Sequence, residues 1–136
     1  MTTTAEHTPQ YQKAASLLKT QGILATVFGS IGIVFGIFLT AIFLLAASIG
    51  TDVTESERVE FIVYGVLMPF LFIIPHIYLV VSGAILLRGP SPKLAKGLSI
   101  ANIVFGALWN LIILITAVLY VAQSSEYEHG YKEAKK

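Results

Sequence analysis

Three long stretches of this 136-residue chain contain no Asp, Glu, Lys or Arg, and they limit its possible folds more than any other feature. They cover residues 20–51, 61–87 and 97–125. Each is longer than the roughly 20 apolar residues that a helix needs to cross the hydrocarbon core of a bilayer. Only 12% of the chain is charged, about half the share usual in a soluble domain. The sequence therefore predicts a small, all-α integral membrane protein.

The three stretches predict one transmembrane domain over residues 22–122. Its expected spanning helices lie at about residues 22–50, 57–88 and 93–122. The connections between them are only a few residues long, so consecutive helices are antiparallel neighbours in an up-down-up arrangement. Residues 1–21 form a polar segment, either a short interfacial helix or a partly ordered tail. Residues 123–136 form a polar C-terminal tail.

Local signals mark where these helices begin and end. Thr54 followed three positions later by Glu57 is a capping box, which satisfies free N–H groups at a helix start. Gly89 suits the left-handed cap that follows a helix. Ser91 and Pro92 then supply an N-cap and a first-position proline for the next helix. Both connections are therefore predicted to be tight turns.

The central helix is expected to be kinked at Pro69 and Pro75. A proline has no backbone N–H and pushes away the carbonyl four residues earlier, so the regular hydrogen-bond ladder is interrupted at each one. In a membrane the freed carbonyls need other partners. The middle of this helix is thus the least regular part of the predicted bundle.

A group of polar and aromatic side chains near mid-membrane is the candidate site. His76 is the one ionisable residue of the Asp, Glu, Lys, Arg or His type within the three stretches, and such groups in membranes are functional candidates by default. Folding about the second turn brings it level with Asn102, with Asn110, Trp109 and Tyr78 nearby. These five would bind a small ligand or relay protons. Alternatively, His76 is a neutral structural histidine bonded to an Asn or a free carbonyl.

Small residues recur at spacings of three and four on the first and third helices, which places them on one face of each. The candidate helix-packing residues are Ala25, Gly29, Gly32, Gly36, Ser99 and Gly106. In lipid, such faces allow close backbone approach between helices. Folding about the first turn sets Gly32 level with Phe72. Three helices bury too little surface to cover both faces, which favours partners: a homo-oligomer or other membrane subunits.

The distribution of charge predicts an orientation. Lys13 and Lys19 precede the first stretch, and Arg88, Lys93 and Lys96 surround the second turn. Because the loops of membrane proteins that are rich in Lys and Arg usually lie in the cytoplasm, the N-terminus and the second turn are expected there. The acidic link over residues 51–60 is then external, and three crossings put the C-terminus outside as well. Compactness and short polar ends favour a prokaryotic plasma membrane.

Composition excludes several functions. The chain has no Cys and a net charge of +1, so it offers no thiolate chemistry and no basic footprint for nucleic acid. His7, His76 and His129 fall in three different compartments of the predicted topology, which implies no metal centre. No carboxylate stands near the hydroxyls in the stretches to complete a nucleophile and base. We therefore expect no enzyme activity and no cofactor.

Two functions remain open at this point. The first is a non-catalytic packing, assembly or regulatory subunit of a homo-oligomer or larger membrane complex. The second is a small oligomeric transporter or channel whose subunits join around the polar site at His76.

Overall fold

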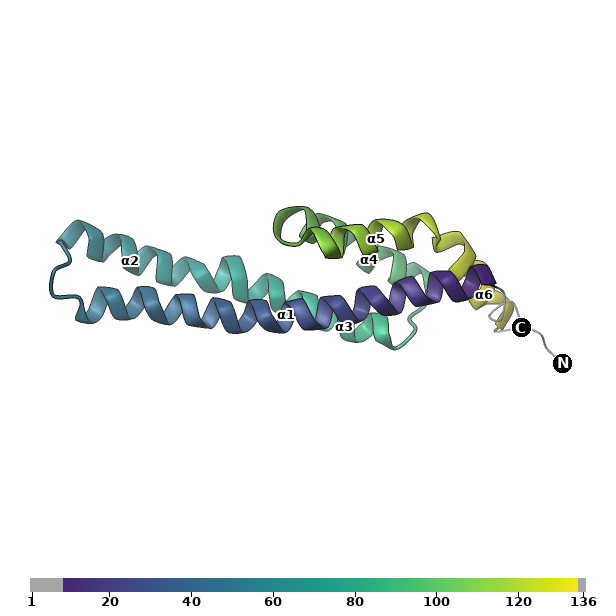
Figure 1. Cartoon of the computed structure of the whole chain (residues 1–136), viewed down its shortest axis with the longest axis horizontal. Coiled ribbons are helices and arrows are strands. Elements are labelled where there is room, and N and C mark those ends of the chain that lie inside the picture. Colours follow the sequence, from purple (N-terminus) through teal and green to yellow (C-terminus); the bar gives the residue numbers. More distant parts are fainter. Residues whose placement is uncertain (1–8, 135–136) are drawn as a thin grey trace. The chain divides into compact units, whose positions relative to one another are not determined.

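The computed structural model describes residues 9–134, and every regular element in that range is a helix (Figure 1). In chain order the elements are α1 (Pro9–Ile49), α2 (Glu55–Met68), the π-helical turn η2 (Pro69–Ile73), α3 (Ile74–Leu87), α4 (Pro92–Trp109), α5 (Leu111–Ala122) and α6 (Ser124–Ala134).

Two helical runs are long and apolar enough to cross a membrane. They are α1, with 41 residues, and the continuous run from α2 through α3, with 33. At 1.5 Å per residue they extend about 60 and 50 Å, more than the roughly 30 Å of a hydrocarbon core. The described part of the N-terminal segment, residues 9–21, is helical and continues directly into the first run. Residues 1–8 of that segment lie outside the described residues.

The predicted helix ends are confirmed. The Glu57 N–H donates to Thr54 Oγ1 at 3.2 Å, and the Thr54 N–H donates to the Glu57 carboxylate at 2.9 Å, which completes the capping box. Gly89 has φ +65°, the left-handed conformation expected after α3. The Ser91 hydroxyl accepts from the Leu94 N–H at the start of α4. Local chemistry at each end thus sets the turns.

The irregularity expected at the two prolines is a π-helical turn. Pro75 has no N–H to offer the carbonyl of Leu71, so the ladder cannot continue in the α pattern. The Ile74 N–H instead donates to the Pro69 carbonyl, five residues back. Widening one turn in this way keeps the chain helical from Glu55 to Leu87.

The third uncharged stretch does not form one helix, so the expected continuous span over residues 93–122 is wrong. α4 ends at Trp109, Asn110 has extended backbone angles (φ −154°, ψ 104°), and α5 folds back beside α4 (Figure 1). A Cβ on Gly106 would lie 2.5 Å from the Leu114 backbone nitrogen, so glycine permits this close return. At 18 and 12 residues, α4 and α5 extend about 27 and 18 Å.

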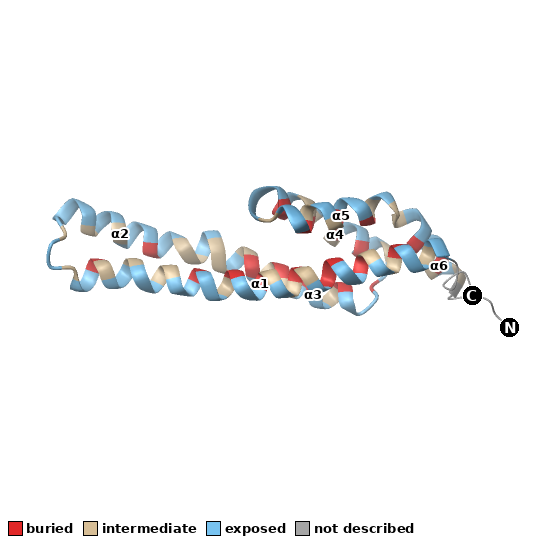
Figure 2. Cartoon of the chain, viewed as in Figure 1, coloured by how far each residue is buried: buried red, intermediate tan, exposed pale blue. Residues whose placement is uncertain are grey.

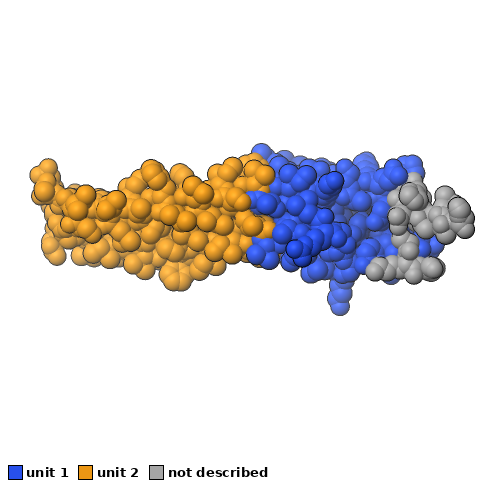
Figure 3. Space-filling view, turned by 90° about the horizontal axis from the view of Figure 1, so that it is seen from below, with its two compact units in different colours: residues 1–26, 81–136 blue, residues 27–80 orange. Residues whose placement is uncertain are grey.

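The described chain divides into two compact units, residues 1–26 with 81–136 (unit 1) and residues 27–80 (unit 2) (Figure 3). Unit 2 is a helical hairpin in which most positions are exposed or half-buried (Figure 2). Its buried residues are Gly29, Gly32, Gly36, Ala47, Gly65, His76 and Leu79. Glycine therefore supplies most of the close contact between the two helices of this unit.

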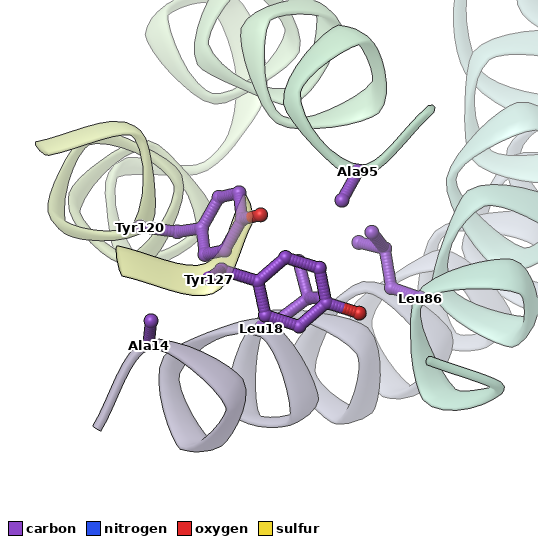
Figure 4. Close-up of a cluster of buried hydrophobic side chains, with 6 residues drawn as sticks. All are labelled: Ala14, Leu18, Leu86, Ala95, Tyr120 and Tyr127. Carbon is purple, nitrogen blue, oxygen red and sulfur yellow. The ribbon is translucent and has the colours of Figure 1, made fainter. Parts of the chain in front are cut away.

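Unit 1 is held by a cluster of buried side chains at the chain ends (Figure 4). The cluster consists of Ala14, Leu18, Leu86, Ala95, Tyr120 and Tyr127. The ring of Tyr11 on α1 stacks on that of Tyr127 on α6, with centroids 5.5 Å apart. The beginning of α1 and the C-terminal helix therefore lie together. The fold-back at Asn110 brings α5 back along α4, and the expected placement of the N- and C-terminal segments on opposite sides of a membrane stays a prediction.

Candidate functional site

Four buried polar side chains form a hydrogen-bonded network in unit 1. The amide of Gln21 on α1 donates to the Ser99 hydroxyl at 3.0 Å. The amide of Asn102 on α4 donates to Gln21 Oε1 at 2.9 Å and to the hydroxyl of Ser82 on α3 at 3.2 Å. None of the four is more than 1% exposed. The network thus ties three helices together through neutral groups that satisfy one another.

Sequence reasoning identified Ser99 and Asn102 but missed Gln21 and Ser82. Gln21 stands four residues before Ala25 and so extends the small-residue face of α1 by one turn. Ser82 stands beside Gly83 in an otherwise apolar helix. Each is a polar residue on a packing face, and that signal was available in the sequence.

His76 lies in unit 2, buried between α3 and α1. Its Nδ1 donates to the Phe72 carbonyl at 2.6 Å, one turn earlier on the same helical run. That carbonyl can only accept, so the proton is on Nδ1. The ring stands against Gly32 of α1, where an added Cβ would overlap it. Gly32 therefore provides the space that His76 occupies.

The neighbouring glycines of α1 make similar close contacts. A Cβ on Gly29 would lie 3.0 Å from the His76 carbonyl oxygen and 2.7 Å from Val80 Cγ2. One on Gly36 would lie 2.9 Å from Ile73 Cγ1. The small-residue face of α1 in unit 2 is thus covered by η2 and α3 of the same chain. Ala25 is likewise fully buried in unit 1.

Asn110 caps a helix. Its side-chain oxygen accepts from the N–H groups of Ile112 and Ile113, at 3.0 and 3.3 Å, where α5 begins. Trp109, the last residue of α4, stacks on Phe105 with ring centroids 5.0 Å apart and is 39% exposed. The polar backbone at the tip of the α4–α5 hairpin is therefore satisfied locally, as an apolar environment requires.

The five residues of the candidate polar site thus have separate surroundings. Asn102 belongs to the network of unit 1, and Asn110 with Trp109 to the hairpin tip. His76 belongs to the glycine-lined contact of unit 2, with Tyr78 half-buried two residues later. A shared site among them stays a prediction.

An aromatic group at the chain ends was not anticipated. The Tyr127 hydroxyl donates to the Pro90 carbonyl at 2.7 Å. Tyr120 packs edge-on against Tyr127, and Tyr131 lies 6.0 Å away by ring centroids. Burial, with smaller effects from the neighbouring tyrosines, raises the pKa of Tyr127 to about 12. The four-residue spacing of Tyr127 and Tyr131 on α6 is the signal that sequence reasoning missed.

These arrangements suit helix assembly. Amides and hydroxyls hold no charge near neutral pH, and the described residues contain no group of three or more His, Cys, Asp or Glu that could hold a metal ion. The fold therefore defines an all-helical protein with two helices able to span a membrane. No family model, curated protein or solved structure matches the chain.

Proposed function

We propose that this chain is a non-catalytic integral membrane protein that serves as a packing, assembly or regulatory subunit of a homo-oligomer or larger membrane complex. The observation that carries the proposal is the use of its buried polar side chains. Gln21, Ser82, Ser99 and Asn102 bond one another across helices, and Asn110 caps α5. Polar groups used in this way stabilise a helical scaffold.

A groove on α1 is the surface on which to look for the partner. It has a volume of about 460 Å³ and lies on the opposite side of the helix from the glycines. The residues that line it are Ser30, Ile31, Val34, Phe35 and Phe38. The small-residue faces do not argue for a partner, because other helices of the chain cover them. The groove remains exposed in the structure.

We further propose an orientation in which the start of α1, the end of α6 and the turn at Gly89 are cytoplasmic and the turn over residues 50–54 is external, in a prokaryotic plasma membrane. Basic residues gather near the start of α1 and around the turn at Gly89, and cytoplasmic segments carry such residues. In this orientation α1 and the α2–α3 run cross the membrane. The α4–α5 hairpin enters from the cytoplasmic side and returns, because each of its helices is shorter than the hydrocarbon core.

The mass of the protein extracted in a mild detergent from its own host tests the subunit role. We expect an oligomer, or stable companions identifiable by mass spectrometry. Val34→Trp, which fills the groove, should release the partner without loss of helicity. Ile62→Trp, at an exposed position on α2, is the matched control. A wild-type monomer without companions would contradict the proposal.

A transporter or channel built around His76 is the second candidate. It is favoured by the π-helical turn η2, which ends three residues before His76, since such turns are frequent at functional sites. This function predicts pH-dependent flux of a small solute or protons in liposomes that His76→Ala abolishes while the protein stays folded. Unchanged flux in that variant would eliminate it.

A further inference from the structure

Five basic residues lie within two positions of residues in the buried cluster of unit 1, and all are exposed. This basic collar consists of Lys13, Lys19, Arg88, Lys93 and Lys96. They come from α1, from the turn after α3 and from the first turns of α4. Basic residues far apart in the sequence therefore flank one cluster.

The buried cluster joins the helices that carry these cations (Figure 4). Its six residues include Leu18 of α1, Leu86 of α3 and Ala95 of α4. Lys19, Arg88 and Lys96 follow these by one, two and one positions. The apolar part of each helix begins or ends beside its cation. The collar thus marks the boundary between apolar and polar surface on all three helices.

Carboxylates do not neutralise this surface. Outside α6, the described residues of unit 1 contain no Asp or Glu. On α6, Glu128 lies near enough to Lys96 for that charge to help lower its pKa, but it already accepts a bond from Lys132 at 2.8 Å. Within residues 9–134, no ion pair involves a member of the collar. The positive charge therefore remains available to an external anion.

We propose that the basic collar binds the phosphate groups of acidic phospholipids. A cation at the end of an apolar helix lies at the depth where lipid tails give way to headgroups, and its long stem reaches the phosphate. The proposal rests on the membrane placement proposed above but not on the subunit role. A protein that forms no oligomer would still bind these lipids.

The test uses the full chain in vesicles of phosphatidylcholine and phosphatidylglycerol in equal amounts. The protein is extracted in a mild detergent, and native mass spectrometry counts the lipids that stay bound. We expect phosphatidylglycerol to be retained in preference to phosphatidylcholine, and each of Lys19→Gln, Arg88→Gln and Lys96→Gln to lower this preference by about fivefold. Equal retention of the two lipids by the wild-type protein overturns the proposal, whether or not an acidic polypeptide co-purifies.

Two further variants separate charge from folding. Lys19→Arg with Lys96→Arg keeps the positive charge and should keep the preference. Thr51→Asp, at an exposed position in unit 2, lowers the net charge by the same single unit outside the collar, and it should leave the preference unchanged. An equal loss in Thr51→Asp and Lys19→Gln would show that net charge, rather than the collar, selects the lipid, and would overturn the assignment.

Discussion

Gly32 matters because it has no side chain, which leaves room for the His76 ring. A helix interior loses stability when it contains glycine, because glycine has the most conformational freedom to lose on folding. At Gly32 that loss is offset by the space it leaves for the His76 ring. Gly97 on α4 makes no such contact, since nothing lies within 4 Å of the position that its Cβ would occupy. The same residue type therefore has opposite effects at the two positions.

Gly32→Ala should lower the free energy of unfolding by about 1–3 kcal/mol, because the methyl group forces the His76 ring from its position. Denaturant titration in detergent, followed by far-UV circular dichroism, measures the change. Gly97→Ala should instead raise stability by up to about 1 kcal/mol. Adding His76→Ala to Gly32→Ala should remove part of the strain. Equal effects of the two alanine substitutions would contradict the contact between Gly32 and His76.

The Tyr127 phenol should lose its proton only at high pH, and this ionisation should make the stability of the fold depend on pH in the alkaline range. Its pKa is raised from 10.0 to about 12 in the folded protein. A raised pKa means that the protonated phenol stabilises the fold fully below pH 10, and that this contribution is lost as the pH rises through 12. Tyrosinate absorbance should show the late titration, and it should be missing in Tyr127→Phe. That variant also loses the bond to the Pro90 carbonyl, at a cost of about 1 kcal/mol near neutral pH. An unchanged titration curve would contradict the assignment.

The packing of helix against helix depends on register, which spacing alone does not set. Symmetric folding about the first turn places Gly32 level with Phe72, whereas the structure places it against His76, one turn farther along. The cause lies at the turn. Arg58, in the first turn of α2, donates to the carbonyls of Ala47 and Gly50 at the end of α1. The first residues of α2 therefore extend beyond the end of α1, and every contact in unit 2 shifts with them.

The α4–α5 hairpin should depend on the cap at its tip. Asn110→Ala removes the acceptor for the Ile112 and Ile113 N–H groups and should cost about 1 kcal/mol of unfolding free energy. Chemical unfolding in detergent gives this value. Asn110→Ser keeps a side-chain oxygen and should recover most of the loss. Equal unfolding free energies for Asn110→Ala and Asn110→Ser would contradict a stabilising role for the cap.

The topology of the whole chain is the feature that differs most from what the apolar stretches indicate. Three uncharged stretches suggest three crossings, and an odd number of crossings separates the two ends of a chain. In the orientation proposed above, the return of α5 along α4 makes the number of crossings even. In that orientation, both ends of the described chain lie on one side of the membrane, which agrees with the contact between Tyr11 and Tyr127.

Cysteine labelling can test this topology directly, because the chain has no native Cys. Ser16→Cys on α1, Thr51→Cys in the first turn and Ser125→Cys on α6 occupy exposed positions. A membrane-impermeant maleimide should label Ser16→Cys and Ser125→Cys from the cytoplasmic side in inverted vesicles, and Thr51→Cys from the outside of intact cells. Labelling of Ser125→Cys from the outside would restore three crossings and contradict the fold-back.

The sequence by itself determined the helical class, the end of α1 near Gly50, the two ends of the α2–α3 run, and the caps at Thr54, Gly89 and Ser91. These features are local: a cap or a proline acts on groups within one turn, so its effect can be read from the residues beside it. Only the tertiary structure decided the fold-back at Asn110 and the partners of His76 and Asn102. An asparagine can continue a helix or cap a new one, and the two states differ by about 1 kcal/mol. Packing of α5 on α4 across Gly106 decides between them, and that contact does not exist until the chain has folded.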